Sequence, residues 1–298
     1  MNVSAPLHAA LALGLLLTFG HTHRVQTRAC PLPSDFAWQP ASPKAGSLFR
    51  VTTSARTVGA TVAATVAGET LHFRVSGDSA VAIAAVPIDS TTGITMTWSC
   101  SGEASGNVRI PTLAGSYKLE RLRVAPRFGA SPDAATAERM RVEAERAAAV
   151  SRDAHNTPRL WSSPFLSPRS SRITSPFGGG RTFNGAVTSR HMGTDYAGAV
   201  GAPVRAANRG VVRIVDAFTL GGNVVYVDHG EGLVTAYLHL SKQLVSVGDT
   251  VARGDTIGRV GATGRVTGPH LHFIARFGTI TVDPAGLNTL ARSAQRPR

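Results

Sequence analysis

A period of two in the apolar residues constrains the fold of this chain more than any other feature. Large apolar residues alternate with polar or smaller ones from Leu71 to Val75, from Val81 to Ala85 and from Ile94 to Trp98. Successive side chains of a β-strand point to opposite faces, so each segment is expected to bury one face. About seven short strands within residues 30–125 are typical of an immunoglobulin-like β-sandwich. We therefore expect a mainly β fold.

A helical segment follows this region. Ser131 is expected to cap the helix, Pro132 fits its first turn, and Asp133 complements the positive end of the helix dipole. The later residues are rich in proline and serine, a composition typical of a linker. Residues 126–168 are therefore predicted to form a charged connecting helix and a linker.

The first residues resemble an export signal. Ala9 to Phe19 is one apolar run that is too short to span a bilayer. Residues 1–29 are therefore predicted to be a signal peptide, which implies a periplasmic or extracellular location. No later segment approaches about 18 consecutive apolar residues, so we expect no stable membrane insertion after the signal is removed.

Cys30 and Cys100 are the two cysteines of the chain. In an exported protein a disulfide is the default state of such a pair. A lipid on Cys30 is the competing interpretation, although Thr27 stands where the lipoprotein signal wants leucine. The sequence leaves both interpretations open.

The chain carries 31 lysines and arginines against 18 aspartates and glutamates, a formal net charge of +13. Such a surface favours anionic partners: nucleic acid, anionic lipid or an acidic wall polymer. The basic residues are spread along the chain and form no recognised nucleic-acid-binding motif, so no nucleic-acid partner is expected. Residues 291–298 are predicted to be a basic, disordered tail.

Four histidines and one aspartate near the C-terminus form the candidate site. His270 and His272 lie two residues apart in a strand-like segment, so both imidazoles point to the same side. His191 and Asp195 form an H-x-x-x-D motif whose glycine favours a loop or strand edge. Two imidazoles and a carboxylate suit zinc with an open fourth position. His239, in another strand-like run, supplies a further imidazole.

Longer motifs around these residues resemble a known family. SPFGGGR, HMGTD, TAYLHLS and TGPHLHF follow one another between Ile173 and Pro284. Together they are similar to the lysostaphin/LytM-type zinc metallopeptidases that cut peptidoglycan. The resemblance implies an antiparallel β peptidase domain with an open groove over residues 169–290, and a structural role for His229.

The resemblance also assigns roles by position. It implies one zinc ion per chain, held by His191, Asp195 and His272. It places His239 and His270 at the two catalytic histidines, which flank the zinc-held water. None of the five positions departs from the family pattern.

These roles imply an exported zinc metalloendopeptidase that hydrolyses peptide cross-links of peptidoglycan through a zinc-activated water, with stem peptides as partners. The alternative is a catalytically silent protein that binds the wall or activates another hydrolase. Silent relatives typically lose ligands, and this chain retains all of them, so the enzyme is favoured. The sequence does not identify which peptide bond of the cross-link is cut. The N-terminal domain has three open roles: covering the groove by intramolecular contact, docking a partner, or spacing the catalytic domain.

Three arginines, Arg181, Arg190 and Arg265, lie in predicted loops beside the site. Stem peptides carry free carboxylates, so a basic rim would help to recruit them. An ordinary solvated arginine is the alternative for each of the three.

Overall fold

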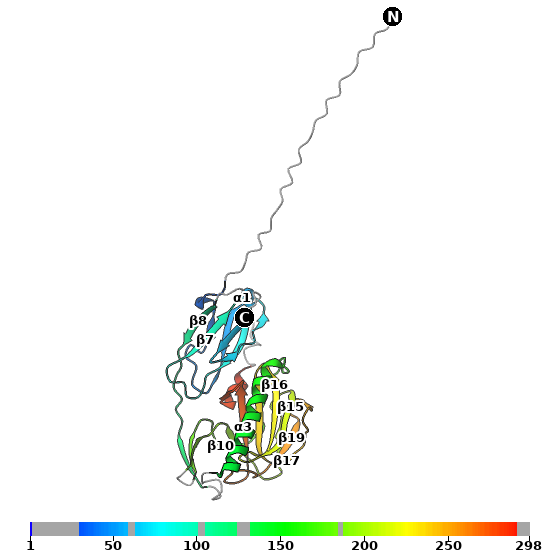
Figure 1. Cartoon of the computed structure of the whole chain (residues 1–298). Coiled ribbons are helices and arrows are strands. Elements are labelled where there is room, and N and C mark those ends of the chain that lie inside the picture. Colours follow the sequence, from blue (N-terminus) through cyan, green and yellow to red (C-terminus); the bar gives the residue numbers. More distant parts are fainter. Residues whose placement is uncertain (2–29, 59–62, 101–104, 124–131, 184–186, 291–298) are drawn as a thin grey trace.

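The computed structural model describes residues 1, 30–58, 63–100, 105–123, 132–183 and 187–290. The predicted signal segment after Met1 and the predicted tail lie outside these residues. Strands dominate this part of the chain, which confirms the predicted mainly β fold (Figure 1). Within it, no helix is both long and apolar enough to cross a membrane.

The N-terminal part is a sandwich of two four-stranded sheets around one apolar core. The sheets have the orders β1-β2-β6-β5 and β4-β3-β7-β8. Their strands are β1 (Ala37–Gln39), β2 (Leu48–Ser54), β3 (Ala63–Val66), β4 (Glu69–Thr70), β5 (Arg74–Ser76), β6 (Ser79–Ala85), β7 (Ile94–Ser99) and β8 (Ser105–Ile110), with η1 (Pro33–Asp35) and α1 (Ala55–Val58) beside them. Along β7, Ile94, Met96 and Trp98 are buried and their neighbours are exposed, as the alternation predicts. The immunoglobulin-like relationship of this sandwich stays a prediction.

The strand expected from Leu71 to Val75 is shorter than the pattern indicates. Only β5 is extended here, and it lies at the edge of its sheet, where Val75 is exposed. Leu71 is buried in the sandwich core although it precedes the strand. Within the described residues, β5 pairs with β6 alone, through a three-residue hairpin ladder, so little of the segment is held extended.

Strand β6 is buried on both faces. Ala82 and Ala84 pack into the sandwich core. Ile83 and Ala85 pack with Leu48 of β2 into the main core of the C-terminal part. Apolar packing across this sheet therefore joins the two parts of the molecule, and it explains why the alternation along β6 is weak.

The C-terminal part is built on a ten-stranded antiparallel sheet. Seven strands follow the order β10-β13-β20-β17-β16-β15-β18, while β19 joins β14 to β17 and β21 pairs with β20. The strands are β10 (Ile173–Ser175), β13 (Thr194–Ala197), β14 (Pro203–Arg205), β15 (Gly210–Phe218), β16 (Gly222–Gly230), β17 (Leu233–Gln243), β18 (Thr250–Val251), β19 (Thr256–Val260), β20 (His270–Phe277) and β21 (Ile280–Val282), followed by η3 (Pro284–Thr289). This arrangement confirms the antiparallel β fold that the motifs imply.

A third sheet, of three strands, joins segments from both parts of the chain. It has the order β12-β11-β9, with β9 (Leu119–Leu122), β11 (Gly180–Phe183) and β12 (Val187–Arg190). Strand β9 runs parallel to β11. The sequence pattern places this segment at the end of the sandwich, whereas the structure pairs it with the C-terminal part.

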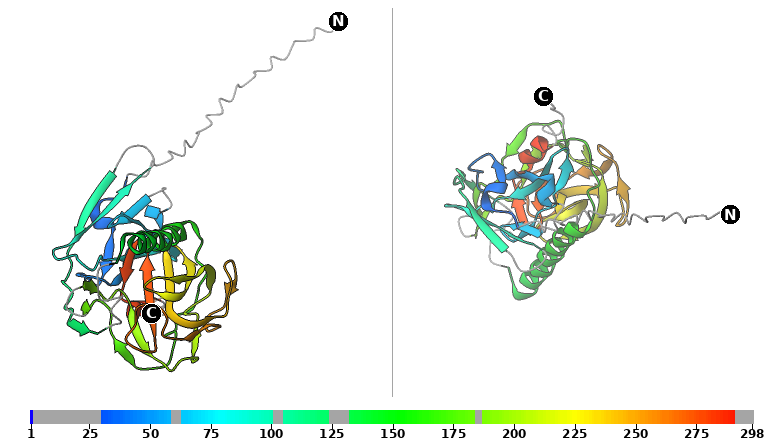
Figure 2. Two further views of the ribbon diagram at one scale, coloured as in Figure 1. Left: turned by 60° about the horizontal axis from the view of Figure 1, so that its bottom comes forward. Right: turned by 90° about the horizontal axis from the view of Figure 1, so that it is seen from above.

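Helix α3 (Ala134–Asp153) lies against the large sheet and is continued by η2 (Ala154–Asn156) (Figures 1 and 2). Its N-cap is Asp133, whose side chain accepts a hydrogen bond from the backbone N–H of Thr136. Ser131, the predicted cap, lies outside the described residues. The helix packs apolar residues against β15, β16 and β17, so it forms a layer of the domain rather than a free connector.

The stretch predicted as a linker is also packed. Trp161 and Phe165 are buried in the core of the C-terminal part. Their rings meet at a steep angle, with centroids 5.1 Å apart. Burial of two large aromatic side chains anchors a segment that its proline and serine content alone marks as flexible.

Candidate metal centre and catalytic groove

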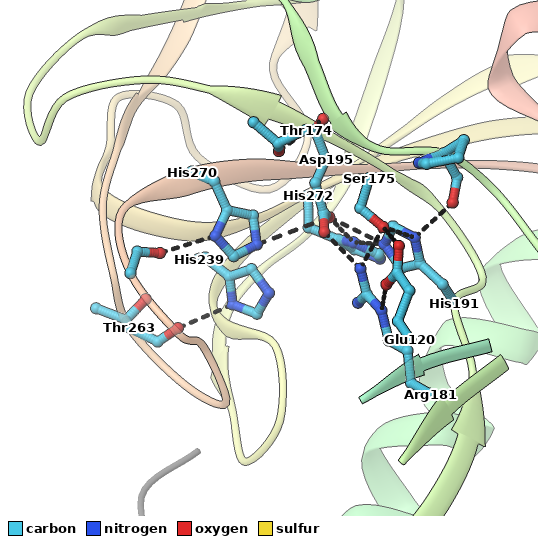
Figure 3. A network of polar contacts seen from close by, with 12 residues as sticks. Glu120, Thr174, Ser175, Arg181, His191, Asp195, His239, Thr263, His270 and His272 are labelled. Atoms are coloured by element: carbon cyan, nitrogen blue, oxygen red, sulfur yellow. Dashed lines mark hydrogen bonds and ion pairs between the residues drawn. The ribbon is translucent and has the colours of Figure 1, made fainter. Parts of the chain in front are cut away.

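Two adjacent strands bring a carboxylate and an imidazole face to face. Asp195 on β13 is the direct ladder partner of His272 on β20, and His272 Nδ1 lies 2.6 Å from Asp195 Oδ1. His191 lies in the turn between β12 and β13, and its Nε2 is 2.9 Å from the same oxygen and 3.0 Å from His272 Nδ1. All three residues are buried. Three donor atoms thus converge on one point (Figure 3).

The donor set fits a metal ion. A carbonyl oxygen can only accept, so His191 Nδ1 donates to that of Pro176 at 2.8 Å, and Nε2 carries the free lone pair. Burial raises the pKa of Asp195, but its contacts with His191 and His272 outweigh burial and hold that pKa below its ordinary value. Burial lowers the pKa of His272, which favours the neutral ring. Two imidazoles and a carboxylate form a typical zinc set with one position open.

Two further histidines, His239 and His270, line one cavity together with the three donors. The rings of His239 and His270 lie edge to face with centroids 5.0 Å apart, and His270 Nε2 is 3.7 Å from Asp195 Oδ1. His239 Nδ1 donates to the carbonyl oxygen of Thr263 at 2.9 Å, and His270 Nδ1 donates to that of Gly268 at 2.8 Å. In each neutral ring Nε2 is therefore the unprotonated nitrogen, able to accept a proton.

A β-bulge turns His239 toward the cavity. Asn223 of β16 pairs with Leu240, and Val225 pairs with Tyr237, so β17 has one more residue than β16 between these pairs. His239 lies in this bulge with a φ of 62°, in the left-handed region. Burial lowers the pKa of His239 to about 3, and the neighbouring histidines add to the effect. The sequence pattern predicts an uninterrupted strand here and carries no signal for the bulge.

Residues 189–284, which contain all five of these side chains, match peptidase family M23. The C-terminal domain belongs to this family. The peptidoglycan DD-endopeptidase ShyC of Vibrio cholerae is 51% identical over 83 residues, which cover 28% of this chain and 19% of ShyC. The catalytic domain of lysostaphin from Staphylococcus simulans is 31% identical, with a TM-score of 0.36, over 40% of this chain and 92% of that chain.

A crystal structure from Pseudomonas aeruginosa that carries the peptidase M23 designation covers more of the molecule. It is 25% identical, with a TM-score of 0.64, and the match covers 83% of this chain and 95% of that chain. The likeness therefore extends beyond the M23 domain into the N-terminal part. This chain spans about a fifth of the length of the curated relatives from Vibrio cholerae.

The M23 assignment confirms the family resemblance of the motifs. M23 metallopeptidases depend on zinc, and the His–Asp–His donor set of this domain is of the kind that holds it. The predicted cofactor, zinc, is thereby confirmed.

The M23 site opens into a cavity of about 630 Å³. Arg190 and Arg265 line it, as the sequence predicts, but Arg190 ends strand β12 and Arg181 lies in β11, so neither is the loop residue that is expected from the sequence. Arg190 also pairs with Asp89 of the N-terminal part at 2.9 Å. Arg181 lines the cavity as well, but its guanidinium is engaged by Asp195 and Glu120. It is therefore neither an ordinary solvated arginine nor a free group of the rim.

Three residues of the M23 site are missed by the sequence reasoning. Ser175 Oγ lies 3.2 Å from His191 Nδ1, and Gly193 lies against the ring of His272. Both belong to motifs that the sequence singles out, SPFGGGR and HMGTD, so a signal exists for them. Glu120 lines the cavity from β9, outside every motif, and nothing local in the sequence marks it.

Proposed function

We propose that this protein is an exported zinc metalloendopeptidase that hydrolyses peptide cross-links of peptidoglycan, in the periplasm or outside the cell. The observation that carries the proposal is the buried His–Asp–His set beside two histidines whose Nδ1 atoms are held by backbone carbonyls in one cavity. The similarity to ShyC, a peptidoglycan DD-endopeptidase, supports stem peptides as the substrate. Residues 30–125 would supply the accessory sandwich, apart from strand β9, and residues 169–290 would form the catalytic unit, against which β9 and helix α3 pack.

In this proposal His191, Asp195 and His272 hold one zinc ion through Nε2, Oδ1 and Nδ1. Zinc bound there would polarise the scissile carbonyl and lower the pKa of a bound water from about 15.7 toward 7. The chain itself supplies fixed donors: the carbonyl of Pro176 sets the tautomer of His191, and the β13–β20 ladder sets the separation of the other two.

His239 and His270 move the proton. Each ring is held by a backbone carbonyl at Nδ1, which leaves Nε2 as the proton acceptor. Either Nε2 can take a proton from the attacking water, and the imidazolium that forms can return it to the leaving amine nitrogen. Burial keeps His239 neutral before the reaction, so its lone pair is available for this transfer.

The charge of the groove suits an acidic peptide. Arg190 and Arg265 line the cavity, together with apolar residues such as Leu220 and Val266. Positive side chains at the wall of a low-dielectric cleft raise the local concentration of anions. Stem peptides, which combine carboxylates with small apolar side chains, match both features.

Digestion of purified sacculi by the full-length protein tests the proposal. We expect zinc-dependent loss of cross-linked muropeptides and release of their monomers, and mass spectrometry of the products will identify the bond that is cut. The matched control is the Asp195→Ala variant, which should release nothing. If the zinc-loaded wild-type protein binds sacculi but cuts no bond, the catalytically silent alternative replaces the enzyme.

A further inference from the structure

We propose that Arg181 and Glu120 position the carboxylate of Asp195 for metal binding. Strand β9, which carries Glu120, would then contribute directly to the M23 site. The inference rests on the proposed role of Asp195 as a zinc ligand. Glu120, Ser175 and Arg181 all lie outside residues 189–284, the part of the chain that matches the family.

Arg181 determines which oxygen of Asp195 faces the metal position. Asp195 Oδ1 is the atom near both histidines, whereas Oδ2 accepts a hydrogen bond from Arg181 Nη2 at 2.7 Å. The side chains of Arg181 and Asp195 are 14% and 8% exposed. A buried guanidinium on one oxygen restrains the rotation of the carboxylate and leaves the other oxygen free for the ion.

Glu120 in turn fixes Arg181. Glu120 Oε2 accepts a hydrogen bond from Arg181 Nε at 2.9 Å, and Oε1 accepts one from Ser175 Oγ at 2.7 Å. Arg181 Nη2 also donates to Ser175 Oγ at 2.8 Å. The three side chains therefore form one closed cluster behind the donor set (Figure 3).

Backbone pairing sets this cluster in place. Glu120 and Arg181 are direct partners in the parallel β9–β11 ladder. The backbone N–H of Gly180 donates to the carbonyl of Lys118 at 2.8 Å, which continues the same pairing. The N-terminal part of the chain thus delivers Glu120 through main-chain hydrogen bonds rather than through a chance surface contact.

The charges of Arg181 and Glu120 explain why both residues are needed to position Asp195. A guanidinium close to a divalent cation repels it, and Arg181 alone would weaken metal binding while orienting its ligand. The carboxylate of Glu120 offsets that charge. Removal of Glu120 leaves Arg181 paired with Asp195 alone, the carboxylate that the metal ion also needs. The positive charge of this mostly buried site is then only partly offset, which disfavours a further cation.

The competing interpretation is that Glu120 obstructs the groove, because it lines the same cavity. The two interpretations predict opposite effects of Glu120→Gln. A positioning residue should lower zinc affinity and turnover when it is changed. An obstructing residue should raise turnover and leave zinc affinity as it was.

The test compares full-length wild type, Glu120→Gln, Arg181→Gln, the double variant and Arg181→Lys. The zinc dissociation constant is measured by competition with a chromophoric chelator, and the visible spectrum of the cobalt-substituted protein reports ligand geometry. We expect the two single Gln variants to bind zinc about 10–100-fold more weakly, the scale for partners of metal ligands. The double variant, which restores the net charge, should lose less than the sum of the singles.

Arg181→Lys separates orientation from charge. Lysine keeps the positive charge but not the planar fork that reaches Asp195, Ser175 and Glu120 together, so we expect it to restore neither the affinity nor the cobalt spectrum. The matched control is Glu231→Gln, which breaks an ion pair with Arg74 and Arg159 far from the donor set. It should leave zinc binding unchanged.

Unchanged zinc affinity in both Glu120→Gln and Arg181→Gln would overturn the inference while leaving the proposed function intact. Faster turnover of Glu120→Gln at unchanged affinity would overturn it in favour of obstruction. A wild-type protein that binds no zinc would remove the proposed function and this inference together. Thermal unfolding of the metal-free variants is measured in parallel, and only variants that melt cooperatively are compared.

Discussion

The backbone of Gly193 lies against the imidazole ring of His272. A Cβ at Gly193 would come within 2.6 Å of His272 Nε2 and 2.7 Å of the carbonyl oxygen of Phe273. The ring is thus held between the turn before β13 and its own strand. Glycine is therefore needed at this position to leave room for the His272 ring, rather than to form the turn.

We expect Gly193→Ala to displace the His272 ring and to weaken zinc binding by at least about 10-fold, since misplacing one of three ligands is costly. Chelator competition on the purified variant measures this. Gly268→Ala is the control: it lies in the same cavity wall, but no atom of the described residues, its chain neighbours aside, lies within 4 Å of its added Cβ. Equal zinc affinity of wild type and Gly193→Ala would contradict the prediction.

Four of the histidine and aspartate positions, two predicted zinc ligands and two predicted catalytic histidines, should divide into two classes under mutation. Asp195→Ala and His272→Ala each remove a donor and should lose zinc and activity together. His239→Ala and His270→Ala keep the three donors, so zinc should stay bound while turnover falls by about 10²–10⁴. The measurement is the zinc content per chain and the turnover rate of each of the four variants. If His239→Ala lost its metal and His272→Ala kept it, the roles would be reversed.

Metal removal should destabilise the C-terminal domain. Zinc binds the assembled donor set and not the dispersed ligands of the unfolded chain, so free zinc at about 100 times its dissociation constant adds about 2.7 kcal/mol to the free energy of unfolding. We expect a lower melting temperature after chelation and recovery when zinc is returned. A melting curve that does not respond to either treatment would argue against a resident ion.

Stability should fall in mild acid because of His229, a buried residue outside the metal site. Its Nδ1 donates to the carbonyl of Arg209, and burial lowers its pKa to about 4, against about 6.5 in the unfolded chain. As the pH falls from about 6.5 to about 4, the unfolded chain gains a proton that the folded protein excludes, so up to about 3 kcal/mol of stability is lost.

The check is the free energy of unfolding in urea, measured between pH 4 and pH 8 for the metal-free wild type and for the metal-free His229→Gln variant. The two proteins share every other titratable group, so the difference between the two curves isolates His229. The variant should show the shallower pH dependence. Parallel curves would show that His229 contributes nothing to it.

The disulfide between Cys30 and Cys100 should stabilise the sandwich. The two cysteines are bonded across 70 residues of sequence, which favours the disulfide over a lipid on Cys30. Replacing both by serine should lower the free energy of unfolding by about 2–4 kcal/mol, measured by urea denaturation of the full chain. A free-thiol assay that finds both cysteines reactive in the native wild type, or an intact mass that includes a lipid, would contradict it.

The sequence by itself determined whatever depends on local geometry. His270 and His272 share a strand face because side chains alternate along any strand. The H-x-x-x-D spacing brought His191 and Asp195 together through a turn, and the motifs around them were specific enough to identify the family. Alternation along β7 likewise predicted its buried face.

The tertiary structure alone decided the contacts between distant segments. Strand β9 pairs with β11 across some 60 residues of sequence and carries Glu120 to the metal site. Strand β6 buries its second face against the C-terminal domain, and a bulge in β17 aims His239 at the cavity. A period of two reports which side of a strand a residue faces, whereas the choice of partner depends on the packing free energy of the whole core. This free energy is a sum over contacts between distant residues, so it produces no local pattern in the sequence.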